Sequence, residues 1–242
     1  MKKYFLAALL ATCLFSCKKK DAFTSPAISD YYPLTPGKYI IYNLDSMVLP
    51  PFGSNFVIHH YEAMDSIDAQ ITDNLGRPAY RILRSLRADS TQPWIPDNTF
   101  VAVETDSTME YTEDNLRFLK LVAPIVNGFS WNGNSHLTSD PYPSYQFNSD
   151  FMADWQYMYQ MVGQPATVGA NTFSNTITVF ERADSTGTPV VVNVTPYAEA
   201  TNSEEVYAKG IGLIYRNFMH WEYQPSRGYI GFGITLAIKD HN

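Results

Sequence analysis

Residues 229–239 read YIGFGITLAIK, and this stretch decides the fold class. Large apolar side chains occupy every second position, and small residues lie between them. Because successive side chains of a β-strand point to opposite faces, this period of two is typical of a strand with one apolar face. The apolar positions are Ile230, Phe232, Ile234, Leu236 and Ile238. Gly231 and Gly233, on the other face, allow a second backbone or a ligand to come close to the strand.

The same alternation recurs along most of the chain. Further strands are expected at 38–47, 56–62, 77–87, 100–105, 109–112, 116–122, 155–162, 176–182, 190–194 and 211–223. Three short segments rich in Gly, Asp, Asn, Ser or Pro separate pairs of these strands and predict β-hairpins. These segments are Asp73–Gly76, Ala183–Gly187 and Gln224–Gly228.

One segment breaks the period of two. Residues 196–209 read PYAEATNSEEVYAK, with Pro at a helix-start position, and Gly210 follows them. This composition predicts a short helix. The expected fold is therefore mainly β: an antiparallel domain, closed or half-closed into a barrel, with one short helix. A β-sandwich is the alternative, and closure into a barrel has the advantage that it removes exposed strand edges.

The N-terminal residues have the features of an export signal. Lys2 and Lys3 precede the apolar run Tyr4–Phe15, which is too short to span a bilayer because a spanning helix needs ~20 residues. Residues Leu14–Cys17 resemble the bacterial lipobox, in which an apolar residue and then a small residue precede a Cys. In that family of signals the Cys thiol receives a diacylglyceryl group, and cleavage makes the Cys the first residue. The resemblance implies that Cys17 carries the lipid.

Three segments follow from this interpretation. Residues 1–16 are expected to be a lipoprotein signal peptide. Residues 17–30 are expected to be the lipidated Cys and a flexible tether, since AFTSPAISD at 22–30 is small, polar and contains Pro. Residues 31–242 are expected to fold as a single β-rich domain. The lipid on Cys17 would make the membrane the first partner of the protein.

Charge and cysteine content exclude several function classes. The 242-residue chain has a net charge of −7, and loss of residues 1–16, which contain two Lys and no acid, would make it −9. An acidic chain argues against binding to nucleic acid. Of the two Cys, Cys13 would leave with the signal and Cys17 would be lipidated. The mature chain would then have no intrachain disulfide, no catalytic thiol and no Cys-ligated zinc.

Several short motifs resemble uncharacterised lipoproteins of Bacteroidota. They are the Lys-rich cluster Lys18–Asp21 after the Cys, Tyr31–Tyr39 (YYPLTPGKY), Gly169–Asn175 (GANTFSN) and Tyr207–Ile214 (YAKGIGLI). The resemblance implies a secreted β-rich domain of unknown function and carries over no catalytic residue. It also implies a cell-envelope location as an outer-membrane lipoprotein, on either the periplasmic face or the cell surface.

The sequence contains two His-x-Glu pairs, a pattern that can contribute ligands to a metal site. His60 shares a strand face with Glu62, and His220 shares one with Glu222, so that two such strands side by side would offer two His and a carboxylate. This spacing matches no known ligand signature, and we expect the His residues to be half-exposed strand residues instead. No nucleophile elbow or phosphate-binding loop occurs, so neither a metal, a cofactor nor an enzyme activity is expected.

Two aromatic loops are the candidate ligand-binding sites. Residues 128–147 contain Trp131, Tyr142 and Tyr145 among Pro, Asn and Ser, and Trp94 lies between two prolines. Exposed aromatic rings beside such polar residues stack on sugars or bind a protein partner. The alternative is that the two Trp side chains hold their loops against the end of the barrel.

These observations favour a lipid-anchored envelope lipoprotein that acts as a non-enzymatic binding or structural module. The partner would be a glycan or an envelope protein. The alternative is a lipocalin-like or lipid-carrier-like barrel with a hydrophobic small molecule inside. An enzyme that acts on glycans or on other envelope substrates is the third hypothesis.

Overall fold

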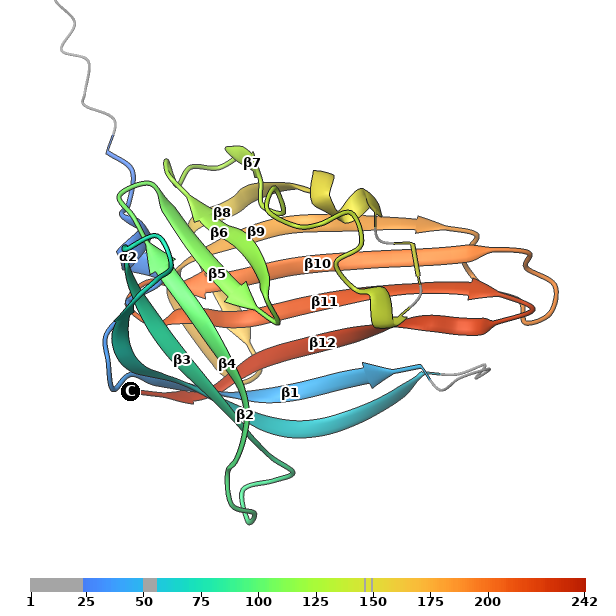
Figure 1. The fold of residues 1–242 in the computed structure, drawn as a ribbon, viewed down its shortest axis with the longest axis horizontal. Coiled ribbons are helices and arrows are strands. Elements are labelled where there is room, and N and C mark those ends of the chain that lie inside the picture. Colours follow the sequence, from blue (N-terminus) through green and yellow to red (C-terminus); the bar gives the residue numbers. More distant parts are fainter. Residues whose placement is uncertain (1–23, 50–55, 146, 149) are drawn as a thin grey trace, which may run out of the picture.

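The computed structural model describes residues 24–49, 56–145, 147–148 and 150–242. In these residues, twelve strands form one antiparallel sheet that curls into a nearly closed barrel (Figure 1). The elements are α2 (Ile28–Tyr31), β1 (Tyr39–Val48), β2 (Val57–Thr72), β3 (Pro78–Arg87), β4 (Ile95–Glu104), β5 (Thr108–Glu113), β6 (Leu116–Val122), β7 (Ser130–Asn132), the 3₁₀ turns η2 (Pro143–Tyr145) and η3 (Asp150–Asp154), β8 (Gln156–Val168), β9 (Asn171–Thr186), β10 (Ala198–Ala208), β11 (Gly212–Gln224) and β12 (Gly228–His241).

The order of the strands explains the closure. The sheet runs β6-β5-β4-β3-β2-β1-β12-β11-β10-β9-β8-β7, so the first and last strands of the chain pair at its centre. Its two edges are β6 and β7, and they lie together: the Leu119 N–H donates a hydrogen bond of 2.8 Å to the Gly133 carbonyl. A single sheet closed in this way confirms the predicted mainly-β barrel with one short helix, and the β-sandwich alternative is wrong.

The N-terminal signal and Cys17 lie outside the described residues. The sequence predicts that the folded domain begins at Tyr31. The structure shows that residues before Tyr31 already pack on the barrel. Ile28 is buried in the main core cluster. The Ser25 hydroxyl accepts a 2.7 Å hydrogen bond from the Ile125 N–H. Among the described residues, no helix is long and apolar enough to cross a membrane.

Two predicted hairpins are confirmed. Strands β2 and β3 are joined by the turn at Asp73–Gly76, and β11 and β12 by the turn at Gln224–Gly228. The close backbone approach expected at the glycines of β12 is also present. Gly231 has a φ of 131°, and a side chain there would lie 2.1 Å from the His220 carbonyl oxygen. Only glycine fits this position without strain.

The helix predicted at 196–209 is wrong, because this segment forms strand β10. It pairs with β9 on one side and with β11 on the other. Glu205 in this strand is only 2% exposed and forms an ion pair with Lys120. In the described part of the chain, the short α-helix is α2 (Ile28–Tyr31) instead.

The hairpin predicted around Ala183–Gly187 is wrong as well. Strand β9 continues through this segment to Thr186, and its partner is β10. Residues 190–194 form no strand. Val194 in this segment is 72% exposed. Burial of its side chain therefore does not stabilise a strand at this position.

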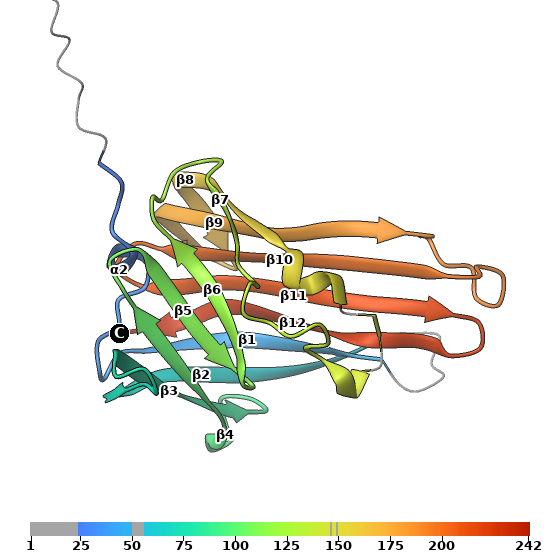
Figure 2. The same ribbon diagram turned by 45° about the horizontal axis from the view of Figure 1, so that its top comes forward.

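The barrel has two distinct halves (Figures 1 and 2). We call the terminal half the end that contains α2, the short strands β5–β7 and the C-terminus. We call the distal half the end at which β9–β12, β1 and β2 extend beyond the short strands. The loop that carries η2 and η3 crosses over β10–β12 in the distal half.

Candidate functional site

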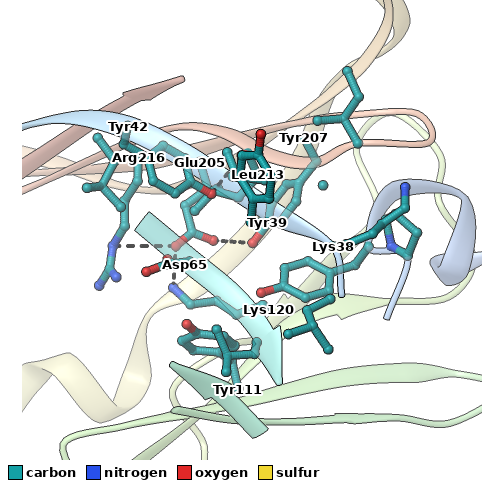
Figure 3. Close-up of a pocket in the computed structure, with 18 of the residues that line it drawn as sticks. Lys38, Tyr39, Tyr42, Asp65, Tyr111, Lys120, Glu205, Tyr207, Leu213 and Arg216 are labelled. Atoms are coloured by element: carbon teal, nitrogen blue, oxygen red, sulfur yellow. Dashed lines mark hydrogen bonds and ion pairs between the residues drawn. The ribbon is translucent and has the colours of Figure 1, made fainter. Parts of the chain in front are cut away.

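The interior of the terminal half contains buried charges (Figure 3). The Lys120 ammonium on β6 lies 3.1 Å from Glu181 Oε1 on β9 and 2.7 Å from Glu205 Oε1 on β10. These three side chains are 5% or less exposed. Lys120 therefore binds two neighbouring strands, whose carboxylates lie 61 and 85 residues further along the chain.

Every oxygen of the two carboxylates has a protein partner. The Tyr207 hydroxyl donates to Glu205 Oε2, and the Ser203 hydroxyl donates to Glu181 Oε2. Arg216 on β11 extends the cluster, with Nη1 2.7 Å from Glu113 Oε2 and Nε 3.6 Å from Glu205 Oε1.

The pKa values of these groups follow from burial and from their partners. Burial raises the pKa of the Glu181 carboxyl, and Lys120 only partly offsets this effect. For Lys120, burial favours the neutral amine, but the two carboxylates outweigh it and raise the pKa. For Glu113, burial raises the pKa, but Arg216 and Arg84 outweigh it, and the pKa is lowered. The cluster thus pairs two cations with three carboxylates.

A cavity of about 60 Å³ lies beside this cluster and is shown in Figure 3. Tyrosine rings line it, including Tyr42 and Tyr111, together with the ion pair of Asp65 and Arg84. That pair is bidentate, with both N–O distances 2.7 Å. A space of this size holds a few water molecules, whereas ligand pockets measure roughly 300–1,000 Å³.

Trp131 lies in the seam that closes the barrel. Its indole Nε1 donates a 2.7 Å hydrogen bond to the Leu119 carbonyl, and its ring centroid is 4.5 Å from that of Tyr159. It is 8% exposed and belongs to the main core cluster. Its contacts are those of a side chain that holds β7 against β6.

Trp94 lies before β4 and contacts a different set of residues. The Arg87 guanidinium is 4.1 Å from its ring centroid, and Arg87 is in turn hydrogen-bonded to Glu62. This is a cation–π contact at a partly exposed position. The two Trp side chains predicted as ligand-binding candidates therefore lie apart: Trp131 packs in the β6–β7 seam, and Trp94 packs on Arg87 of β3.

The structure does bring Tyr142 and Tyr145 together. Both rings pack on Phe232 of β12, with centroid distances of 5.2 Å for Tyr142 and 4.4 Å for Tyr145. Tyr145 is 41% exposed and borders an open groove of about 460 Å³ between η2 and the distal ends of β1 and β12.

The His-x-Glu pairs do not meet, because β1 and β12 separate β2 from β11 in the sheet. His60 is exposed, with Nδ1 2.6 Å from Asp45 Oδ1. The expectation that His220 is half-exposed is wrong: it is fully buried, and its Nδ1 lies 2.8 Å from the Thr201 hydroxyl. Burial lowers the pKa of His220 to about 4. Within the described part of the chain, no group of three or more His, Cys, Asp or Glu residues is placed to hold a metal ion.

The sequence prediction missed the charged cluster, although a signal was present. Lys120 has the same parity as Phe118 and Val122 in its strand, and Arg216 has the same parity as Ile214 and Phe218. A cation on an otherwise apolar face has to find a buried partner or leave the sheet. That pattern marks both residues as members of an interior ion-pair cluster.

Comparison with known proteins leaves the family open. No family model matches the chain, and no curated protein matches it. Among solved structures, the chain is similar to the crystal structure of a putative exported protein with YmcC-like fold from Bacteroides fragilis NCTC 9343. The TM-score is 0.36 and the identity 11%, over 89% of this chain and 100% of that one. A likeness at this level carries no argument about function.

Proposed function

We infer that the exported chain is an outer-membrane lipoprotein, held by a lipid on Cys17, and that its barrel is a non-enzymatic binding or structural module of the cell envelope. The Leu14–Cys17 motif and the apolar run before it support the anchor. Two or more acyl chains on one residue give stable membrane attachment.

The filled interior is the observation that favours this function over a carrier of hydrophobic ligands. The space beside Lys120 and Glu205 measures about 60 Å³ and is bordered by ion pairs. An acyl chain placed there would have to separate these pairs, and a buried charge without its partner is strongly destabilising. Ligands are therefore expected to bind on the outside or at the open distal half.

The anchor is tested with two matched cysteine variants produced in a Gram-negative host. Wild type and Cys13→Ser, which changes only the expected signal peptide, should fractionate with the outer membrane and incorporate labelled palmitate. Cys17→Ser should lose the label and leave the membrane fraction. A Cys17→Ser variant that stays membrane-bound would contradict the anchor. Protease treatment of intact cells then separates the cell surface from the periplasmic face.

The filled interior is tested by mass spectrometry of organic extracts from the purified protein. We expect no amphiphile beyond the covalent lipid on Cys17. One bound amphiphile per protein would overturn the proposal in favour of the lipocalin-like alternative.

A further inference from the structure

We propose that the groove between η2 and the distal ends of β1 and β12 binds a saccharide. This inference rests on the proposed function as a non-enzymatic binding module and names its ligand class. The groove has a volume of about 460 Å³, within the range of small-ligand sites. Residues that line it include Ser46, Val48, Tyr145, Arg227 and Phe232.

The groove contains a fixed aromatic platform. Tyr145 stacks on Phe232, with the ring planes inclined by 29°, and still leaves 41% of its surface exposed. Phe232 is in turn held by Phe218, at a centroid distance of 5.0 Å, and by Tyr142. Because these rings pack behind Tyr145, its position is set before a ligand arrives, which lowers the entropic cost of binding.

Polar groups lie on both sides of this platform. The Ser46 and Ser144 hydroxyls line the groove together with Tyr145. A second hollow of about 120 Å³ shares Tyr145 and Phe232 and is lined by Asp114 and Arg216. The site is thus a strip of aromatic surface with hydrogen-bonding side chains at its edges.

This combination matches a sugar ring better than other occupants. A pyranose presents a flat C–H face, which stacks on an aromatic ring, and hydroxyl groups around its edge, which need polar partners. An acyl chain would cover the Ser46 and Ser144 hydroxyls without offering them a hydrogen bond, at a cost in free energy. A stable protein interface needs about 800 Å² from each partner, more than one stacked Tyr and a short strip supply.

The location also favours a soluble glycan over a membrane lipid. The described chain begins beside α2 in the terminal half, so an anchor on Cys17 would hold that half toward the bilayer (Figure 1). The groove lies in the distal half, near the Gln224–Gly228 turn. It would therefore face away from the membrane.

The test uses the full exported chain, purified in detergent, on an array of oligomers of two to six hexose or N-acetylhexosamine units. We expect at least one oligomer to bind, and titration calorimetry with that oligomer then gives the affinity. Tyr145→Ala should weaken it about tenfold, because a truncated aromatic anchor typically loses this much. Tyr145→Phe should retain it, since the stacking face is kept. The matched control is Tyr61→Ala, which removes a Tyr of β2 that is 36% exposed and outside the groove.

Thermal unfolding of each variant distinguishes a loss of binding from a loss of folded protein. A blank array, or a Tyr145→Ala variant that binds like wild type, overturns the saccharide site. If Cys17-dependent membrane attachment persists with a blank array, only this inference fails. If the array binds but Cys17→Ser stays in the membrane, the anchor fails and the saccharide site stands.

Discussion

The terminal and distal halves of the barrel solve the same packing problem in different ways. In the terminal half the interior contains Lys120 and Arg216 among carboxylates. In the distal half the same side of the sheet is filled by aromatic rings around Phe232, and its one buried imidazole, His220, contacts Phe147 at a centroid distance of 4.4 Å. Strand β11 takes part in both halves, since Arg216 and His220 lie on it four residues apart.

The difference indicates which half of the barrel can admit a ligand without loss of stability. Buried ion pairs are stable only when each charge keeps its partner, so the terminal half has little freedom to admit a ligand. Packed aromatic rings do not each require a specific charged partner. In the distal half they leave an open groove beside Tyr145. We therefore expect the terminal half to determine stability and the distal half to determine binding.

The largest expected effect is on the buried cation. Lys120→Met keeps the length of the side chain but leaves Glu181 and Glu205 without their shared ammonium, and should lower the free energy of unfolding by about 3–5 kcal/mol. Urea denaturation measures this loss. The control is Asp184→Ala, which breaks the exposed 2.6 Å pair with Arg182 and should cost no more than ~1 kcal/mol. Equal effects of the two substitutions would remove the proposed distinction between the halves.

A pH-dependent effect of about 3 kcal/mol is expected from His220 in the distal half. Its pKa is lowered by burial to about 4, so the folded state binds fewer protons than the unfolded state between pH 4 and 6.5. Its contribution to stability is thus complete above pH 6.5 and is lost as the pH falls toward 4. The size follows from about 1.4 kcal/mol per unit of pKa.

Comparison with His220→Gln isolates this contribution. The substitution keeps a polar group for the Thr201 hydroxyl but cannot be protonated. Denaturation curves from pH 4 to 7.5 should show a weaker fall in stability for His220→Gln than for wild type. Parallel profiles would mean that the imidazole is not held neutral among the aromatic rings.

A smaller effect is expected at the seam of the barrel. Trp131→Phe removes the indole N–H from the Leu119 carbonyl and leaves a small void, which should cost about 1–3 kcal/mol. Trp94→Phe, at a partly exposed position, should cost less. Thermal unfolding compares the two. If Trp131→Phe instead weakened saccharide binding without any loss of stability, the seam would belong to the binding region and the division into halves would need revision.

The sequence predicted most strands because their signals are local. The alternation at 229–239 and the turn at Gln224–Gly228 identify the last hairpin without further information. Local signals failed at 196–209, which was predicted to be a helix and forms strand β10. Whether a Glu in a strand is solvated or buried depends on a partner elsewhere, and for Glu205 that partner is Lys120, 85 residues away.

The sequence predicted some of the residues of the candidate site but not others. Aromatic residues among prolines indicated Tyr142 and Tyr145, which do meet at Phe232. The same signal indicated Trp131, which is a core residue of the seam. Composition identifies an aromatic loop, but which of its rings faces solvent depends on the surface that the loop covers.

The sequence by itself determined the β-class of the fold and two of its hairpins, since alternation and turn chemistry lie within short stretches of chain. Only the tertiary structure decided the closure of β6 against β7, the burial of Lys120 among carboxylates and the exposure of Tyr145. Each of these depends on contacts between residues that are distant in sequence, and a local pattern does not specify such contacts.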